Sequence, residues 1–232
     1  MLGGLSEILS VLALVGFSAV TLWLLARPVA RMGVLMPTPR MLTLAAAATA
    51  LWCAALALFA PGSSQALVAQ ALRDLAMLGW LSATFWSAAA PMSRPLRLIL
   101  RLLMTIASLA LVLGAAAHWR AGAEAETWMA PTLIFAAMIV AIGGLLIVDS
   151  GGGHASAGLR MPVMAVAGCF AMLWAYELNA QLIGALTGKR ASTLIELLPA
   201  VVLLILPTYV VAAMDIGRER MRLSRTAATR RT

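Results

Sequence analysis

The chain is poor in charged residues, in aromatic residues and in the side chains that most often bind metals. Of its 232 residues, 11% are charged and 6% are aromatic, and there are only two cysteines and two histidines. Because soluble domains carry about 25% charged residues, this composition argues against a soluble enzyme, a disordered protein and a nucleic-acid-binding domain. Cys53 and Cys169 both lie inside apolar runs, which favours buried free thiols over a disulfide or a metal-binding pair.

Apolar residues are abundant instead: they make up 62% of the chain and give it a mean hydropathy of +0.96. A soluble core of this length cannot bury so much apolar surface. A helix that crosses a bilayer needs about 20 apolar residues. The sequence therefore predicts an all-α integral membrane protein, a bundle of seven transmembrane helices at 5–26, 41–60, 66–90, 96–117, 131–148, 162–186 and 194–214.

Proline and glycine mark several of the predicted helix ends. Pro95, Pro131 and Pro162 are expected at helix starts, where the missing N–H of proline has no helical partner to lose. The glycine-rich segment 149–158 is expected to be a flexible loop. It lacks the ending of a phosphate-binding loop, so we do not expect it to bind nucleotides.

The net charge of +8 predicts the orientation of the helices. With the N-terminus outside, the inner segments hold 13 basic residues, and the outer segments hold only Arg120, Lys189 and Arg190. Basic residues collect in cytoplasmic loops, so we expect the N-terminus outside and the C-terminus inside. The chain then divides into a transmembrane domain, 1–214, and a basic cytoplasmic tail, 215–232, which is expected to bind anionic lipid headgroups.

Ionisable residues at membrane depth are the strongest candidates for a functional site, because they are costly to bury there. Three candidate residues lie in the segment 66–90, four lie in the segment 162–186, and one lies near the start of the segment 194–214. The candidate ligand-binding or structural cluster is Gln70, Arg73, Asp74, Tyr176, Glu177, Asn179, Gln181 and Glu196.

Helix geometry brings two members of this cluster to the same depth. At 1.5 Å per residue, Arg73 lies about 10 Å and Glu177 about 13 Å below the outer ends of their helices. We therefore expect an ion pair between Arg73 and Glu177, with Asp74 and Glu196 as competing partners. Two interpretations stay open: a structural cluster in which Arg73 extends toward the outer surface, or a ligand- or proton-sensing pocket open to that side.

Pro207 lies in the middle of the last predicted helix, where proline bends a helix and frees a backbone carbonyl. It is a candidate hinge between the outer polar residues and the cytoplasmic tail. Lysine is absent from every predicted helix, since the single lysine, Lys189, falls in a loop. That absence excludes a retinal Schiff base.

Several segments resemble the membrane sensor module of the histidine kinases associated with PEP-CTERM/exosortase systems. The segment FAMLWAYELNAQL resembles a Phe-Ala-Tyr-Asp segment of that family, with Glu177 in place of the aspartate. Four further segments are similar to family elements, and the resemblance covers about 80 residues, mainly in the second half of the chain. The segments that carry the resemblance are 72–78, 147–150, 170–182, 190–199 and 222–227.

The resemblance implies a sensor or receptor-like module of a bacterial two-component system in the inner membrane, with a cytoplasmic kinase output domain and a second copy of the chain as partners. The 232 residues hold no phospho-acceptor or ATP-binding element, so we expect a sensor module without catalytic activity. No catalytic residue, metal ligand, cofactor or nucleic-acid partner is expected. The alternative function is a small transporter or channel, or an accessory membrane protein of exopolysaccharide or envelope metabolism.

Overall fold

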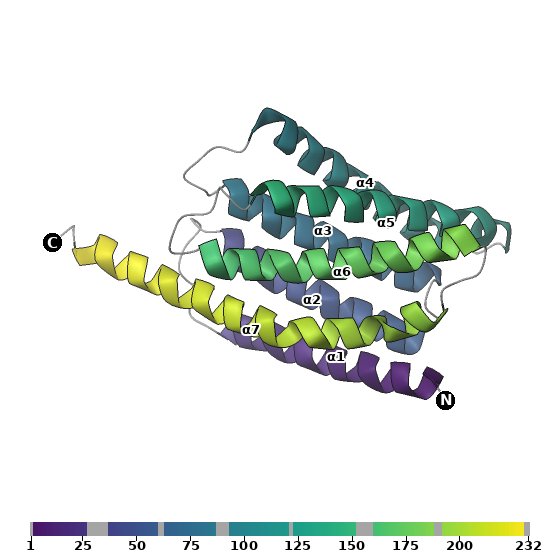
Figure 1. The fold of residues 1–232 in the computed structure, drawn as a ribbon, viewed down its shortest axis with the longest axis horizontal. Coiled ribbons are helices and arrows are strands. Elements are labelled where there is room, and N and C mark those ends of the chain that lie inside the picture. The colour runs from purple at the N-terminus through teal and green to yellow at the C-terminus, as the bar shows by residue number, and fades with distance from the viewer. Residues whose placement is uncertain are drawn as a thin grey trace.

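The chain folds as a bundle of seven α-helices in the computed structural model (Figure 1). The structure describes residues 2–26, 37–59, 63–86, 93–120, 123–151, 160–187 and 192–229. No strand occurs within these ranges. The helices are α1 (Leu2–Ala26), α2 (Pro37–Leu58), α3 (Ser64–Trp86), α4 (Arg94–Arg120), α5 (Ala123–Gly151), α6 (Arg160–Thr187) and α7 (Ser192–Thr229).

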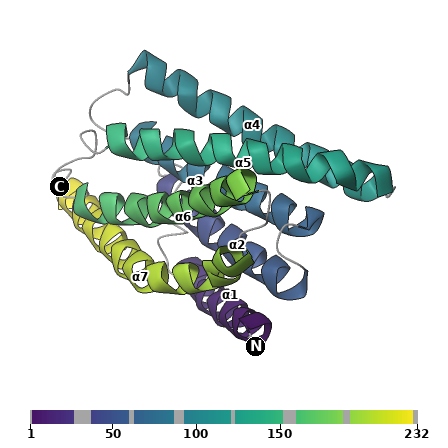
Figure 2. The same cartoon turned by 45° about the vertical axis from the view of Figure 1, so that its right-hand side comes forward.

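The helices form a closed ring. Each helix packs against the next one along the chain, and α7 packs against α1 (Figures 1 and 2). Helix α3 also contacts α5 and α6, so it lies deeper in the bundle than its neighbours. None of its side chains from Ser64 to Phe85 is exposed.

Among the described residues, six helices are long and apolar enough to cross a membrane, and the chain is a multi-pass membrane protein. They are α1, α2, α4, α5, α6 and α7. The physical reason why α3 differs is its position. Because other helices cover the face of α3 that carries Gln70, Arg73 and Asp74, these polar residues face protein and not hydrocarbon. Seven predicted helices are confirmed, whereas hydropathy supports six of them as spans.

The helix that best illustrates the lipid-facing exterior is α1. Its buried residues, Ser10, Ala13, Phe17 and Val20, follow a spacing of three and four and form one stripe toward the bundle. Its other side is apolar but exposed, as Leu22 shows with 67% of its surface accessible. The exterior of the bundle is thus a surface suited to lipid.

Two predicted helix boundaries are wrong. Pro131 does not begin a helix but lies inside α5, which starts eight residues earlier at Ala123. The intervening segment is rich in Ala and Glu, which are strong helix formers and extend the helix past its apolar part. The same helix continues through Asp149 to Gly151. The first three residues of the predicted glycine-rich loop, 149–151, are therefore helical.

The last helix also exceeds its predicted length. Helix α7 runs from Ser192 through Pro199 and Pro207 to Thr229, so residues 215–229 of the predicted tail are helical. Lys189, Arg190 and residues 152–158 of the glycine-rich segment lie outside the described residues.

Candidate functional site

Arg73 occupies the interior of the bundle and forms a two-pronged ion pair with Glu177. Its Nη1 donates to Oε1 of Glu177 at 2.5 Å, and its Nη2 donates to Oε2 at 2.7 Å. The pair joins α3 to α6 across 104 residues of sequence. The predicted pairing of Arg73 with Glu177 is confirmed. Two parallel hydrogen bonds between a guanidinium and a carboxylate fix both their distance and their orientation.

Asp74 is the second acidic partner of Arg73. Its Oδ1 accepts from Nε of Arg73 at 3.1 Å and from Nη2 at 2.6 Å. The same oxygen accepts from Nε1 of Trp174, on α6, at 3.1 Å. Asp74 therefore adds a second bridge between α3 and α6, through the indole of Trp174.

Gln70 and Trp52 complete the surroundings of the ion pair. Gln70 donates from Nε2 to Oε2 of Glu177 at 3.1 Å. The ring of Trp52, on α2, lies over the guanidinium, with Cζ of Arg73 4.1 Å from the ring centroid. This is the geometry of a cation–π contact, in which the electron-rich face of the indole stabilises the cation. We call Trp52, Gln70, Arg73, Asp74, Trp174 and Glu177 the charge cluster.

Helical spacing explains how two helices supply most of the charge cluster. Gln70 and Asp74 are four residues apart on α3, and Trp174 and Glu177 are three residues apart on α6, so each pair lies on one face of its helix. A glycine on α5 makes room for the indole. A Cβ at Gly144 would lie 2.5 Å from the ring of Trp174.

The charge cluster is closed to its surroundings. The Arg73 side chain is 0% exposed, and Gln70, Asp74 and Glu177 are buried as well. Arg73 therefore does not extend toward the outer surface, as one interpretation of the sequence expected. Because it has no exposed surface, Arg73 itself does not line a pocket that opens outward. Asp74 borders a cavity of about 10 Å³, which is about the space of one water molecule.

The charges of the cluster do not balance, because one guanidinium faces two carboxylates. Both carboxylates accept from Nη2 of Arg73, so they share one nitrogen. With both acids ionised, the cluster carries one surplus negative charge. Chemically it can hold α3 and α6 together, and it can change its charge by taking up a proton.

The other predicted site residues lie apart from the charge cluster. Tyr176 faces α7, where its hydroxyl donates to the carbonyl of Leu194 at 2.7 Å. Asn179 is exposed and donates to the carbonyl of Ala175 within its own helix. Gln181 and Glu196 are half-buried. Of the two competing partners that the sequence suggested for Arg73, the structure selects Asp74 and not Glu196.

Helix α7 is attached to the bundle on both sides of Pro207. The thiol of Cys169, on α6, donates to the carbonyl of Ile205 at 3.8 Å. The hydroxyl of Tyr209 donates to the carbonyl of Leu42, on α2, at 2.8 Å. Because Pro207 has no N–H, it cannot bond the carbonyl four residues before it. The contacts to α2 and α6 therefore hold the helix where its own hydrogen bonding is interrupted.

Sequence reasoning missed the two tryptophans of the charge cluster. Neither Trp52 nor Trp174 is among the candidate residues that the sequence indicated, yet both contact charged groups. The spacing of three residues between Trp174 and Glu177 was the available signal for one of them. For Trp52 no such signal exists, because its partner lies on a different helix. Within the described residues, no group of three His, Cys, Asp or Glu side chains could hold a metal ion.

Comparison with known proteins leaves the family of this chain open. No family model matches the sequence, and neither a curated protein nor a solved structure matches the chain. The geometry of the charge cluster and its connection to α7 are therefore the basis for a functional assignment.

Proposed function

We propose that the chain is the membrane-embedded sensor module of a bacterial signal-transduction system. It crosses the inner membrane seven times, with the N-terminus outside and the C-terminus in the cytoplasm. The observation that carries the proposal is the connection that α6 makes between the charge cluster and α7.

Two consecutive residues of α6 make this connection. Glu177 is bound to Arg73 on α3, and Tyr176 is bound to the carbonyl of Leu194 at the start of α7. Consecutive side chains of a helix project about 100° apart, so α6 contacts the two helices with different faces. A shift of α6 relative to α3 therefore reaches α7 directly through the Tyr176 hydrogen bond.

Helix α7 provides the route toward the cytoplasm. Its apolar span, Leu194–Asp215, continues without a break to Thr229, which adds roughly 20 Å of helix. Figure 1 shows this C-terminal part extending beyond the rest of the bundle. A movement at one end of a continuous helix displaces the other end. The six arginines of segment 215–232 favour anionic headgroups and a cytoplasmic output domain, such as a kinase, as partners.

The surplus negative charge supplies the switch. When Glu177 loses its charge, Arg73 and Asp74 form a balanced pair within α3, and α6 loses its ion pair with α3. The Tyr176 contact does not depend on that charge, so α6 and α7 move together. Such a change requires two arrangements of the helices that differ in their contacts with Glu177.

The proposal is tested by measuring the position of α7 in the full chain. Spin labels at Val211→Cys on α7 and Leu98→Cys on α4 report the distance between two exposed sites on helices that are not neighbours in the ring. Glu177→Gln, which removes the charge of Glu177, is expected to shift this distance by about 1–2 Å or more in liposomes. Cys53 and Cys169 are buried, and a sample without the two new cysteines measures their background labelling.

Three further variants test whether the change at Glu177 reaches α7 through Tyr176 or through a general disturbance of the fold. Tyr176→Phe removes only the hydroxyl that binds α7, so the double variant Glu177→Gln/Tyr176→Phe is expected to keep the original distance. Asn179→Ala, on an exposed face of α6, is expected to change nothing. An unchanged distance in a correctly folded Glu177→Gln protein would contradict the proposal. Solute flux through the same liposomes would favour the transporter instead.

A further inference from the structure

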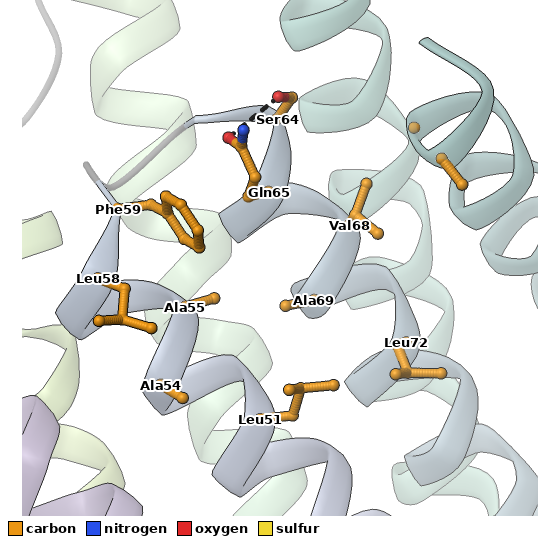
Figure 3. Close-up of a pocket in the computed structure, with 12 residues that line it drawn as sticks. Leu51, Ala54, Ala55, Leu58, Phe59, Ser64, Gln65, Val68, Ala69 and Leu72 are labelled. Atoms are coloured by element: carbon orange, nitrogen blue, oxygen red, sulfur yellow. Dashed lines mark hydrogen bonds between the residues drawn. The ribbon is translucent and has the colours of Figure 1, made fainter. Parts of the chain in front are cut away.

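A second feature of the bundle lies on the other side of α3 from α6. The helices α2, α3 and α4 line a cavity of about 360 Å³. Figure 3 shows it between the C-terminal part of α2 and the N-terminal part of α3. It is separate from the charge cluster, because no member of that cluster lines it.

The lining of this cavity changes in polarity along its length. At one end, where α3 begins, Ser64 and Gln65 are polar, and the hydroxyl of Ser64 donates to Oε1 of Gln65 at 3.2 Å. Toward Leu51 and Leu72 the described walls are apolar (Figure 3). From Ser64 to Leu72 the cavity follows α3 for about 12 Å.

The cavity borders the lipid-facing surface. Leu51, Leu58 and Phe59 line it and are each exposed. The remaining walls include small residues such as Ala54 and Ala69, whose short side chains leave space between the helices. Apolar space of this size does not hold water well, and if it stayed empty its walls would lose their dispersion contacts.

We propose that this cavity is a binding site for one acyl chain of a membrane phospholipid. The helix ends lie where the headgroup region begins, so Ser64 and Gln65 meet the ester groups of the lipid. The apolar walls between Leu51 and Leu72 take the first part of the chain toward the middle of the bilayer. Both the polarity and the direction of the cavity match a lipid that enters from the side of the bundle.

The cavity lies next to the parts of α2 and α3 that carry residues of the charge cluster. Ala69 and Leu72 line the cavity and are the chain neighbours of Gln70 and Arg73 on α3. Leu51, another lining residue, precedes Trp52 on α2. An acyl chain in the cavity therefore supports the part of α2 and α3 from which the charge cluster is built.

The test is photolabelling of the full chain in liposomes that contain a phosphatidylcholine with a diazirine in one acyl chain. After irradiation, mass spectrometry locates the attached lipid. We expect several-fold more label on residues 51–72 than on the lipid-facing residues of α1. Ala54→Phe fills the cavity and is expected to remove this excess. The matched control Ala57→Phe, a half-buried position one turn along the same helix and outside the lining, is expected to keep it.

Three results would overturn the proposal. Equal labelling of all exposed helices would show that lipid merely surrounds the bundle. An excess that persists in a folded Ala54→Phe protein would place the lipid elsewhere. Label from a free fatty acid with the same diazirine, without label from the phospholipid, would show that the cavity takes a different ligand. None of these results depends on a sensor function.

Discussion

In a soluble protein the more apolar of two helices is usually the more deeply buried one, but helices α1 and α3 of this chain show the reverse. Helix α1 is strongly apolar, yet among its described side chains only Ser10, Ala13, Phe17 and Val20 are buried. Helix α3 carries Gln70, Arg73 and Asp74, yet none of its described side chains between 64 and 85 is exposed.

This difference shows that hydropathy in this chain follows contact with lipid and not burial in protein. A lipid-facing side chain has to be apolar because hydrocarbon offers no hydrogen bonds. A side chain surrounded by other helices can be polar, provided that its partners are present. Four predictions, from the largest expected effect to the smallest, test whether the two helices obey these different rules.

The largest effect is expected from reversing the charge of Arg73. Arg73→Glu leaves three buried carboxylates without a cation and is expected to cost at least about 3–5 kcal/mol of stability. Adding Glu177→Arg restores one cation to two carboxylates and is expected to recover much of this loss. Unfolding in mixed detergent measures both variants. Failure of the double variant to regain stability would contradict a specific pairing of α3 with α6.

The second effect concerns the hydrogen bond of Trp174. Trp174 and Trp80 are both 0% exposed, and the rings of both lie near Phe170. Only the indole of Trp174 donates to Asp74, whereas Nε1 of Trp80 has no partner among the described residues. Trp174→Phe is therefore expected to cost about 1.5–3 kcal/mol more than Trp80→Phe in the same unfolding measurement. Equal losses of stability in the two variants would mean that Trp174 stabilises the bundle by packing alone and not through its hydrogen bond to Asp74.

A comparable or smaller effect is expected from filling the space at Gly144. Gly144→Val pushes a side chain into the ring of Trp174 and is expected to destabilise the bundle by about 1–3 kcal/mol. Gly168 on α6 is the matched control, because nothing lies within 4 Å of an added Cβ there. If Gly168→Val lowered the thermal midpoint as much as Gly144→Val, close packing against Trp174 would not be the cause.

The smallest effect is expected on the lipid-facing side of α1. Leu22→Ala is expected to change stability by no more than about 0.5 kcal/mol, because Leu22 contacts lipid and little protein. Phe17, on the same helix, is buried and packs edge-on against Tyr209 with ring centroids 5.6 Å apart. Phe17→Ala is expected to cost about 3–5 kcal/mol. Similar losses from the two variants would show that α1 has no distinct lipid-facing side.

Much of the fold could be predicted from the sequence because long apolar runs have few alternatives. Backbone groups in lipid have to bond within their own segment, so such runs become helices. The start of α5 could not be predicted from hydropathy, because the Ala- and Glu-rich segment before Pro131 extends the helix beyond its apolar part. The end of the apolar run at Val148 did not mark the other boundary either, since the helix continues to Gly151.

The candidate site was predictable where the argument depended on helix geometry. Rise per residue placed Arg73 and Glu177 at one depth, and the structure joins them. The same argument left Glu196 and Asp74 as equal alternatives, because depth alone does not say which helix face meets which neighbour. Trp52 shows the limit most clearly, since its contact with Arg73 depends on how α2 is rotated against α3.

The sequence by itself determined that the chain is helical, that it belongs in a membrane and that Arg73 needs an acidic partner. These properties follow from composition and from the cost of burying a charge, and both are read residue by residue. Only the tertiary structure decided that α3 lies deeper in the bundle than its neighbours, that the charge cluster is closed, and that Tyr176 and Glu177 face different helices. Those facts depend on how helices rotate and pack against each other, which periodicity along one helix does not specify.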